Sequence, residues 1–467
     1  MKRLTGADAT FLYMQTPNSY SEIAACIVVD AAALPSGEAL LDHSLAWLEP
    51  RLHLAPHLRR KLVRVPLELD HPVWIEDPHF DLEYHVRHVA LPAPGSMDQL
   101  GDLVGRLLSR PLDHSRPLWE MYVIEGLEPD QGAYFLKTHH AAIDGVAAFA
   151  LVASFVDLTP DAPPPPPPDQ PWEPESVPSD LELVGRATLN LARQPLRGLK
   201  AVRRLARSMR QAQTRHGDAM AALGQSAVPP TRFNEPIGPH RRVRFLDLPL
   251  DDVKAMKSAT GTKLNDVVLA VVSGGLRRYL DRHGELPAEP LVAFVPVSGR
   301  SSDSTEGATE GNQTSMVHIE LATDEPDVAA RLKRIASAGD EAKSRHADLG
   351  PSVLLDLTEF GGPALANASM RVMEALRLAE RMRFGGNVVV SNIPGPSFPL
   401  YTAGAAIRRL YPVGPVVQGS GLNITLLSYL DNLGFSIVAD RDLVPDLDDL
   451  VADLRASYDE LAAALGS

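Results

Sequence analysis

Apolar and polar positions follow two alternating periods along this chain, one typical of strands and one of helices. Short apolar runs from Ile23 to Val29 and from Met121 to Glu125 predict buried strands, because β-branched and bulky side chains suit a pleated surface. Apolar residues recur three and four positions apart from Asp98 to Leu108 and from Leu250 to Thr260, which predicts amphipathic helices. This alternation of strands and helices indicates an α/β fold.

The same pattern predicts further elements in both halves of the chain. Strands are expected from Lys61 to Val65, from Val243 to Asp247 and from Leu291 to Pro296. A final helix is expected from Asp446 to Leu465. Trp119, just before one predicted strand, is interpreted as a core anchor.

A proline-rich segment separates two parts of the chain. Six consecutive prolines, residues 163–168, can form only polyproline II and would span roughly 19 Å at about 3.1 Å per residue. We therefore expect an N-terminal domain at residues 1–158, a linker and crossover at 159–228, and a C-terminal domain at 229–467.

Composition narrows the class of protein. The 467 residues are 45% apolar and carry a net charge of −14, so two domains with real cores are expected and a general nucleic-acid binder is not. Cys26 is the only cysteine, so no internal disulfide can form and a reducing compartment fits. The first 15 residues hold no apolar run typical of a secretory signal. A cytoplasmic protein, or a peripheral one at a membrane or lipid body, is expected.

One stretch of an acidic protein is strongly basic. Residues 183–217 contain nine Lys or Arg residues and no acid, beside a stripe of apolar positions. A basic amphipathic helix suits an anionic lipid surface. A solvated helix packed across the domain junction is the alternative, and the sequence does not separate the two.

The densest chemistry lies where a predicted strand gives way to a helical pattern, between Ala133 and Asp157. Here His139 and His140 are followed by Asp144 and Gly145. Successive side chains of a strand point to opposite faces, so the two histidines cannot face one cleft unless the strand has already ended. We expect one histidine to face a pocket and the other to support it.

Simpler interpretations exist for each of these residues. A lone histidine beside a strand is usually structural, and an Asp-Gly pair is ordinary turn chemistry. Metal ligation by His140 and Asp144 does not match the usual spacing of zinc ligands, so no metal is expected. The combination His-His-x3-Asp-Gly, however, resembles the active-site motif of the coenzyme A-dependent acyltransferase superfamily, which includes condensation domains of peptide synthetases.

Other motifs narrow the resemblance to one branch of that superfamily. In order along the chain, they are similar to motifs of the bacterial wax ester synthase/diacylglycerol acyltransferases: Asp8 to Leu12, Pro117 to Trp119, His139 to Gly145, Asn265-Asp266, Val295 to Arg300, Ser391 to Pro396 and Leu422 to Tyr429. The resemblance covers nearly the whole chain. One segment departs from it, because many relatives carry a Met-His-Val-Gly-like strand where this chain has Ser19 to Ile23.

The resemblance implies a fold and a reaction. The fold is a pair of chloramphenicol-acetyltransferase-like domains with the active-site tunnel at their interface. The reaction is transfer of a long-chain acyl group from acyl-coenzyme A, a co-substrate, to diacylglycerol or a long-chain alcohol. No permanently bound cofactor is implied. A condensation-type enzyme that uses carrier-protein thioesters, and a non-catalytic homologue that binds lipid or coenzyme A, are the alternatives.

The chemistry of ester formation assigns a role to each residue of the motif. His140 is expected to be the general base, because an acceptor hydroxyl is a poor nucleophile until a base takes its proton. Asp144 is expected to orient the loop through an arginine, Gly145 to allow a tight turn, and His139 to support the loop. Asn265 is a candidate for stabilising the oxyanion or shaping the site, although helix capping is its ordinary explanation.

Overall fold

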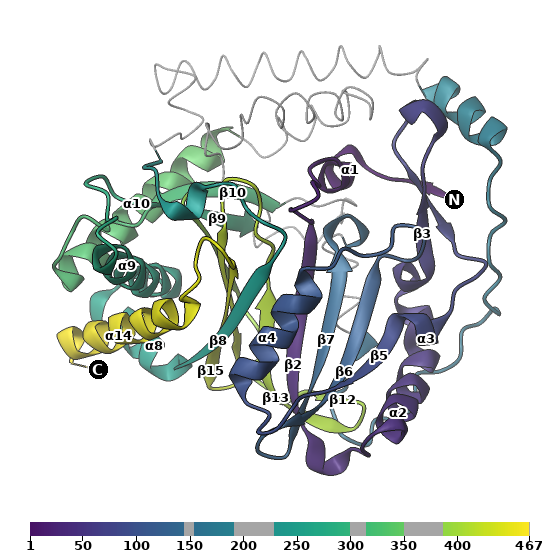
Figure 1. Ribbon diagram of the computed structural model, residues 1–467, viewed down its shortest axis with the longest axis horizontal. Helices are drawn as coiled ribbons and strands as arrows, with labels where there is room; N and C mark the ends of the chain where they lie inside the picture. Colours follow the sequence, from purple (N-terminus) through teal and green to yellow (C-terminus); the bar gives the residue numbers. More distant parts are fainter. Residues whose placement is uncertain (144–153, 191–227, 299–313, 350–385, 467) are drawn as a thin grey trace.

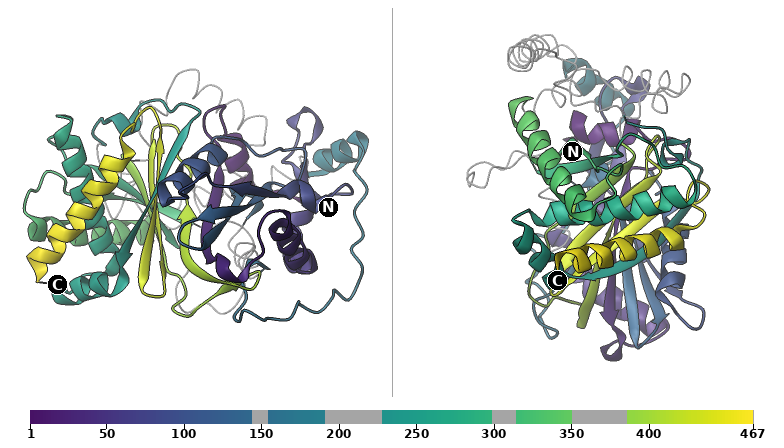
Figure 2. Two further views of the ribbon diagram at one scale, coloured as in Figure 1. Left: turned by 60° about the horizontal axis from the view of Figure 1, so that its bottom comes forward. Right: turned by 90° about the vertical axis from the view of Figure 1, so that its left-hand side faces the viewer.

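Two six-stranded sheets form the centre of the molecule (Figure 1). The computed structural model describes residues 1–143, 154–190, 228–298, 314–349 and 386–466. Within them, strands and helices alternate as the apolar pattern predicts, and the α/β class is confirmed. The helices α8, α9, α10 and α14 lie on the outer side of the second sheet, away from the first sheet (Figure 2).

The first sheet has the strand order β12-β13-β2-β7-β6-β5. Neighbouring strands are antiparallel except β5 and β6, which are parallel. The strands are β2 (Glu22–Asp30), β5 (Val86–Ala90), β6 (Trp119–Leu127), β7 (Gln131–His139), β12 (Tyr401–Thr402) and β13 (Ala405–Val413). Helix α2 (Glu38–Leu48) packs against this sheet, and α1 (Gly6–Tyr13) contacts the turn that follows β7.

The second sheet has the order β10-β9-β11-β14-β15-β8. Its strands are β8 (Arg241–Pro249), β9 (Val292–Ser298), β10 (Thr314–Glu320), β11 (Val388–Ile393), β14 (Leu422–Tyr429) and β15 (Asn432–Asp440). Strand β11 runs parallel to both of its neighbours, and the other pairs are antiparallel. Helices α8 (Leu250–Thr260), α9 (Leu264–Arg282), α10 (Val328–Leu349) and α14 (Leu447–Leu465) belong to its helical layer, with α9 and α14 among the best-buried elements of its apolar core.

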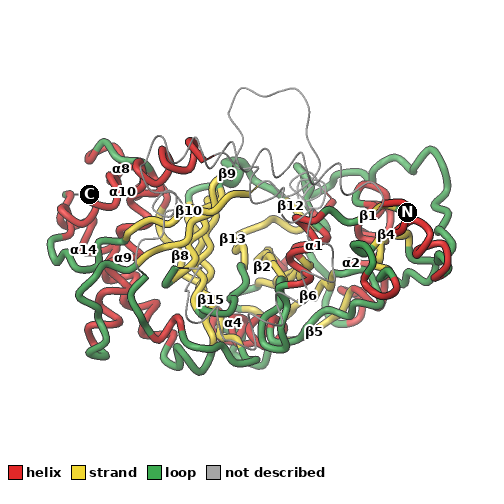
Figure 3. Tube along the Cα trace, turned by 90° about the horizontal axis from the view of Figure 1, so that it is seen from above, coloured by secondary structure: helices red, strands yellow, loops and turns green. Residues whose placement is uncertain are grey.

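The first sheet takes strands from both halves of the chain. Strand β13, which follows the strand β11 of the second sheet in sequence, pairs with β2 so that Tyr411 lies opposite Cys26. The Tyr411 ring also stacks on Phe245 at 4.5 Å, and its hydroxyl donates to Asp247 of β8 at 2.9 Å. Strand β13 therefore joins the two sheets (Figure 3).

Helix α4 (Met97–Leu108) makes a second connection between the sheets. Gly101 and Gly105 face the backbone of β8 so closely that a Cβ atom would lie 2.4 Å and 2.7 Å from the nearest carbonyl oxygen, respectively. Arg244 of β8 donates to Asp102 at 2.8 Å. The two glycines allow α4 and β8 to approach to contact distance, which fixes how the two sheets lie beside each other.

Local differences from the expected elements have simple causes. Strand β3 (Arg60–Val63) ends two residues before the predicted Val65. Pro66 follows and begins a 3-10 turn, Pro66–Glu68, and proline has no N–H to donate to a ladder. Strand β3 belongs to a small third sheet with β1 (Lys2–Arg3) and β4 (Val73–Glu76). Trp119 is buried, and its indole N–H donates to Leu58 O at 2.7 Å, so its prediction as a core anchor is confirmed.

Candidate active site

The strand β7 ends between the two histidines. His139 is its last residue and pairs with Glu22 of β2, and its backbone N–H donates to Leu118 O at 3.0 Å. His140 begins a 3-10 turn, His140–Ala142, and its backbone N–H donates to Ser21 O at 2.8 Å. Because the strand ends here, the two side chains are not bound to opposite faces of one sheet. His139 is fully buried and His140 is half-buried.

Both ring nitrogens of His139 are engaged. The backbone N–H of Ala141 donates to Nδ1 at 3.0 Å, and the side-chain amide of Gln15 lies 2.6 Å from Nε2. The ring of His114 meets the His139 ring edge to face at 5.7 Å. Burial, with smaller contributions from His114 and His140, lowers the pKa of His139 to about 3. His139 is therefore neutral at pH 7, and its ring is hydrogen-bonded to the backbone of the turn that follows.

His140 lies flat against an aromatic ring of α1. Phe11 and His140 stack with ring centroids 3.9 Å apart and planes 10° from parallel. Burial lowers the pKa of His140 below its ordinary value, because a charged imidazolium is poorly solvated there. At pH 7 the ring is neutral and has one nitrogen able to accept a proton.

A buried charge cluster lies behind this turn. Lys137, two residues before His139 on β7, is fully buried, and its Nζ lies 3.3 Å from Glu22 and 3.8 Å from Glu120. Nζ also donates to the carbonyl oxygens of Leu107 at 3.2 Å and Arg110 at 2.6 Å. Burial raises the pKa of Glu22, and the charge of Lys137 opposes this rise. The cluster fastens the end of α4 to the strands β2, β6 and β7.

Asn265 lies in the first turn of α9 but does not cap it. The capping carboxylate is Asp266, which accepts from the backbone N–H of Lys263 at 2.9 Å. The side-chain oxygen of Asn265 instead accepts from Asn392 of β11 at 3.5 Å, a long hydrogen bond. Two motifs that lie 127 residues apart in the sequence thus meet in the C-terminal half. Within the described ranges, the hydrogen bond of Asn265 leads to Asn392 and not to either histidine.

The remaining part of the predicted site falls outside the described residues. Asp144 and Gly145 belong to residues 144–153, which the structure does not describe. The basic stretch also lies outside the described residues from residue 191 onward. The roles of these residues, the tunnel at the domain interface and the domain boundaries remain predictions.

Comparison with known proteins identifies the family. The family model for the wax ester synthase/diacylglycerol acyltransferase catalytic domain matches residues 4–268, and the model for the C-terminal domain of the same enzymes matches residues 310–462. A putative diacylglycerol O-acyltransferase of Mycobacterium tuberculosis is 38% identical over 96% of this chain and 87% of its own length. The chain belongs to the wax ester synthase/diacylglycerol acyltransferase family.

Other members and solved structures agree with this assignment. A putative diacylglycerol O-acyltransferase of Mycobacterium bovis is 35% identical over 84% of each chain. The wax ester synthase/diacylglycerol acyltransferase from Marinobacter aquaeolei superposes with a TM-score of 0.68 at 28% identity, covering all of both chains. The first condensation domain of the calcium-dependent antibiotic synthetase shares the fold, with a TM-score of 0.56 at 17% identity over 100% of this chain and 97% of that chain. The chloramphenicol-acetyltransferase-like fold implied by the motifs is confirmed.

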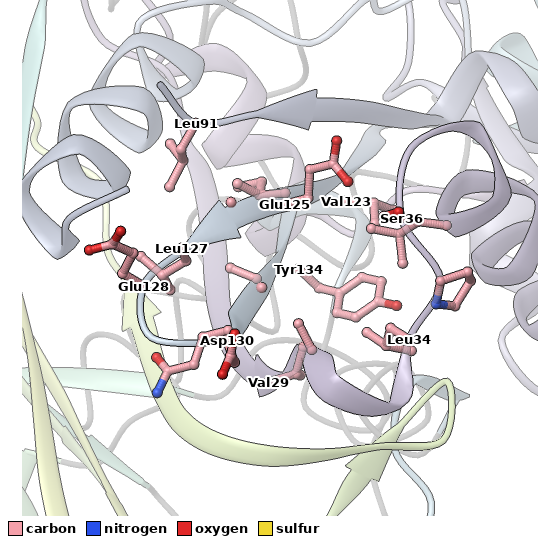
Figure 4. A pocket seen from close by; sticks show the side chains of 18 of the residues that line it. Val29, Leu34, Ser36, Leu91, Val123, Glu125, Leu127, Glu128, Asp130 and Tyr134 are labelled. Carbon is pink, nitrogen blue, oxygen red and sulfur yellow. The ribbon is translucent and has the colours of Figure 1, made fainter. Parts of the chain in front are cut away.

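A cavity of about 470 Å³ lies at the other end of the first sheet (Figure 4). Its wall includes Tyr134 and Leu34, with the carboxylates of Glu125, Glu128 and Asp130 around it. Strand β7 has nine residues, and at about 3.3 Å per residue its two ends are roughly 26 Å apart. The cavity adjoins the Gln131 end of β7, so it lies away from the two histidines.

The residues that surround the histidines were not singled out from the sequence. Phe11 belongs to a motif that carried only the family resemblance, whereas Gln15, His114 and Lys137 gave no signal in isolation. The motif position of Phe11 was the one available clue to a site role.

In the described parts of the chain, no helix combines the length and the apolar character needed to cross a membrane.

Proposed function

We propose that this protein transfers an acyl group from acyl-coenzyme A to the hydroxyl of a diacylglycerol or a long-chain alcohol. The observation that carries the proposal is His140, a neutral half-buried histidine placed just after β7 in a chain of the wax ester synthase/diacylglycerol acyltransferase family. The mycobacterial relatives named as diacylglycerol O-acyltransferases favour diacylglycerol as one acceptor. The segment Ser19 to Ile23, which differs from the sequence found in many relatives, contacts the histidines through Ser21 and Glu22. We therefore expect this segment to influence which acceptor the enzyme prefers.

The reaction needs one base that later acts as an acid. His140 accepts the proton of the acceptor hydroxyl while the hydroxyl oxygen attacks the thioester carbonyl carbon. The carbon–sulfur bond then breaks, and the departing sulfur of coenzyme A takes the proton from the imidazolium. A general base of this kind contributes roughly 10²- to 10⁴-fold to the rate. The lowered pKa of His140 supports this role, because it keeps the imidazole neutral at pH 7.

Four further residues complete the proposed site. His139 supports the turn, a role consistent with its full burial and its two ring contacts. Asp144 orients the loop through an arginine, and Gly145 permits the turn. Asn265 donates a hydrogen bond to the oxyanion or shapes the site together with Asn392. One oxyanion donor typically stabilises the transition state by about 3 kcal/mol.

The first experiment supplies purified acyl-coenzyme A with either dioleoylglycerol or hexadecanol and follows thiol release and ester formation. His140→Ala should lower kcat at least about 100-fold with little change in acyl-coenzyme A affinity. His79→Ala, at an exposed histidine far from the motif in sequence, is the matched control. Transfer only from a carrier-bound acyl group would instead support the condensation-type reaction, and coenzyme A binding without turnover would support a non-catalytic homologue.

Association with an anionic lipid surface belongs to the same proposal. Residues 180–190 form a helix that leads into the basic stretch, and its Leu181 and Leu189 are 84% and 63% exposed. Charge reversal at the basic positions should weaken binding to anionic vesicles by about 1 kcal/mol per residue; the positions to reverse are Arg197, Lys200, Arg204 and Arg207. Lys257→Glu on α8 is the control. Unchanged vesicle flotation would favour a helix that only bridges the domains.

A further inference from the structure

Helix α1 contacts the turn that carries His140, although nearly 130 residues separate them in sequence. The helix begins at a well-formed cap, in which Thr5 Oγ1 accepts from the backbone N–H of Asp8 at 3.1 Å and donates to the Asp8 carboxylate at 2.6 Å. Figure 1 shows α1 beside the upper end of β2, the strand that pairs with β7. A capped helix at this place is a defined support for the turn.

Two contacts join this N-terminal segment to the two histidines. Phe11 covers one face of the His140 ring at 3.9 Å and nearly parallel. Gln15, two residues beyond the end of α1, lies 2.6 Å from Nε2 of the fully buried His139, which is 124 residues away in the sequence. One segment therefore contacts both residues of the His-His pair, each through a different kind of interaction.

The two contacts act on the histidines in different ways. A stacked ring restricts rotation of the imidazole about its Cβ–Cγ bond, and it leaves the ring edge, where both nitrogens lie, directed away from the Phe11 ring. The 2.6 Å contact between the side-chain amide of Gln15 and Nε2, together with the hydrogen bond that Nδ1 accepts from Ala141 N–H, fixes the orientation of the His139 ring. Because His140 follows directly in the chain, a fixed His139 also fixes the backbone from which His140 projects.

We propose that Phe11 and Gln15 are positioning residues for acyl transfer, which set the ring plane of His140 and the backbone of the His-His turn. This inference rests on the proposed function, in which His140 is the general base. Misplacement of a catalytic group by about 1 Å can cost on the order of 100-fold in rate. The effect should therefore appear in kcat and not in the binding of acyl-coenzyme A.

The main test compares two substitutions at Phe11. Phe11→Leu keeps an apolar cover but removes the ring, and it should lower kcat roughly 10-fold or more, with KM for acyl-coenzyme A changed by about twofold or less. Phe11→Tyr keeps the stack and should retain near-normal kcat. Gln15→Ala should lower kcat in the same manner. Met14→Ala, at an exposed position between them, is the matched control and should behave as the wild type.

A double-mutant cycle separates positioning from general structural damage. If Phe11 acts through His140, Phe11→Leu should have no further effect on kcat in the His140→Ala background. Proton NMR of the histidine rings gives a readout independent of turnover, because the stacked phenyl ring shifts the His140 signals. That shift should be lost in Phe11→Leu and kept in Met14→Ala.

The outcomes distinguish this inference from the proposed function. Wild-type kcat in folded Phe11→Leu, or an equal further loss in the His140→Ala background, would overturn the positioning role while leaving acyl transfer intact. Failure of Phe11→Tyr to retain activity would overturn it as well. A wild-type protein without acyl transfer would overturn the proposed function, and the positioning role with it.

Discussion

Lys137→Met should strongly destabilise the protein, although it exchanges one unbranched side chain for another of comparable length. The ammonium group of Lys137 is fully buried between Glu22 and Glu120 at 3.3 Å and 3.8 Å. At an effective dielectric constant of about 20, each pair interacts with roughly 4 to 5 kcal/mol, which compensates the cost of burying the charges. Methionine supplies neither this charge nor a donor for the carbonyl oxygens of Leu107 and Arg110.

The two carboxylates should respond unequally to this substitution. Glu120 retains Arg87 at 3.2 Å and the hydroxyl of Tyr122 at 2.8 Å. Glu22 retains only the backbone N–H of Leu112, at 2.7 Å, among its contacts in the described residues. A buried charge that loses its partner costs roughly 3 to 5 kcal/mol, and we expect a loss of this size, caused mainly by Glu22.

The loss of stability in Lys137→Met should depend on pH, in a direction set by Glu22. Burial already raises the pKa of Glu22, and removing Lys137 removes the charge that opposes the rise. The folded variant then holds a proton on Glu22 at a pH where the unfolded chain has released it. Its deficit relative to the wild type should therefore shrink as the pH falls from 7 toward 5, by at most about 1.4 kcal/mol per pH unit.

Urea unfolding at pH 7 and pH 5 measures both effects. The double variant Glu22→Gln with Lys137→Met should recover at least about 1 kcal/mol relative to Lys137→Met, because it removes the stranded charge. Lys254→Met, which breaks an exposed ion pair with Asp251, is the control and should cost less than about 1 kcal/mol. A loss below about 1 kcal/mol in Lys137→Met, or a double variant less stable than the single one, would refute the reasoning.

Three further predictions test other parts of the structure. Burial lowers the pKa of His139 to about 3, so below pH 6.5 the unfolded chain binds a proton that the folded protein does not. The free energy of unfolding should therefore fall as the pH decreases from 7 to 4. In His139→Gln the urea midpoint should depend less steeply on pH, and an unchanged slope would contradict this. Gly105→Ala should cost about 1 to 3 kcal/mol in thermal or urea unfolding, because its Cβ would lie 2.7 Å from the carbonyl oxygen of Arg241, whereas Gly185→Ala, with open space at its Cβ position, should not destabilise the fold. The rate kcat should hold its plateau at pH 6.5 and decline only at lower pH, since burial lowers the pKa of His140; a decline centred above pH 6.5 would exclude a neutral buried base.

Much of the local structure could be predicted from the sequence because its causes are local. The apolar periods located β2, β6, α4, α8 and α14 to within a few residues, since burial of one face imposes a repeat that is visible in a short window. The sequence also placed the His-His pair where a strand gives way to a helical pattern, but only the structure shows that β7 ends at His139. The order of the motifs was sufficient to identify the family.

The partners of the buried polar and aromatic groups were decided only by the tertiary structure. Nothing local to Lys137 indicates that Glu22 will lie beside it, because that contact depends on the antiparallel register of β2 and β7. The same holds for Phe11 on His140 and for Asn392 on Asn265. A sequence period reports which face of an element is buried, and it carries no information about which distant element covers that face. That choice follows from the packing of the whole chain, so the motif was readable from the sequence while the residues that hold it in place were not.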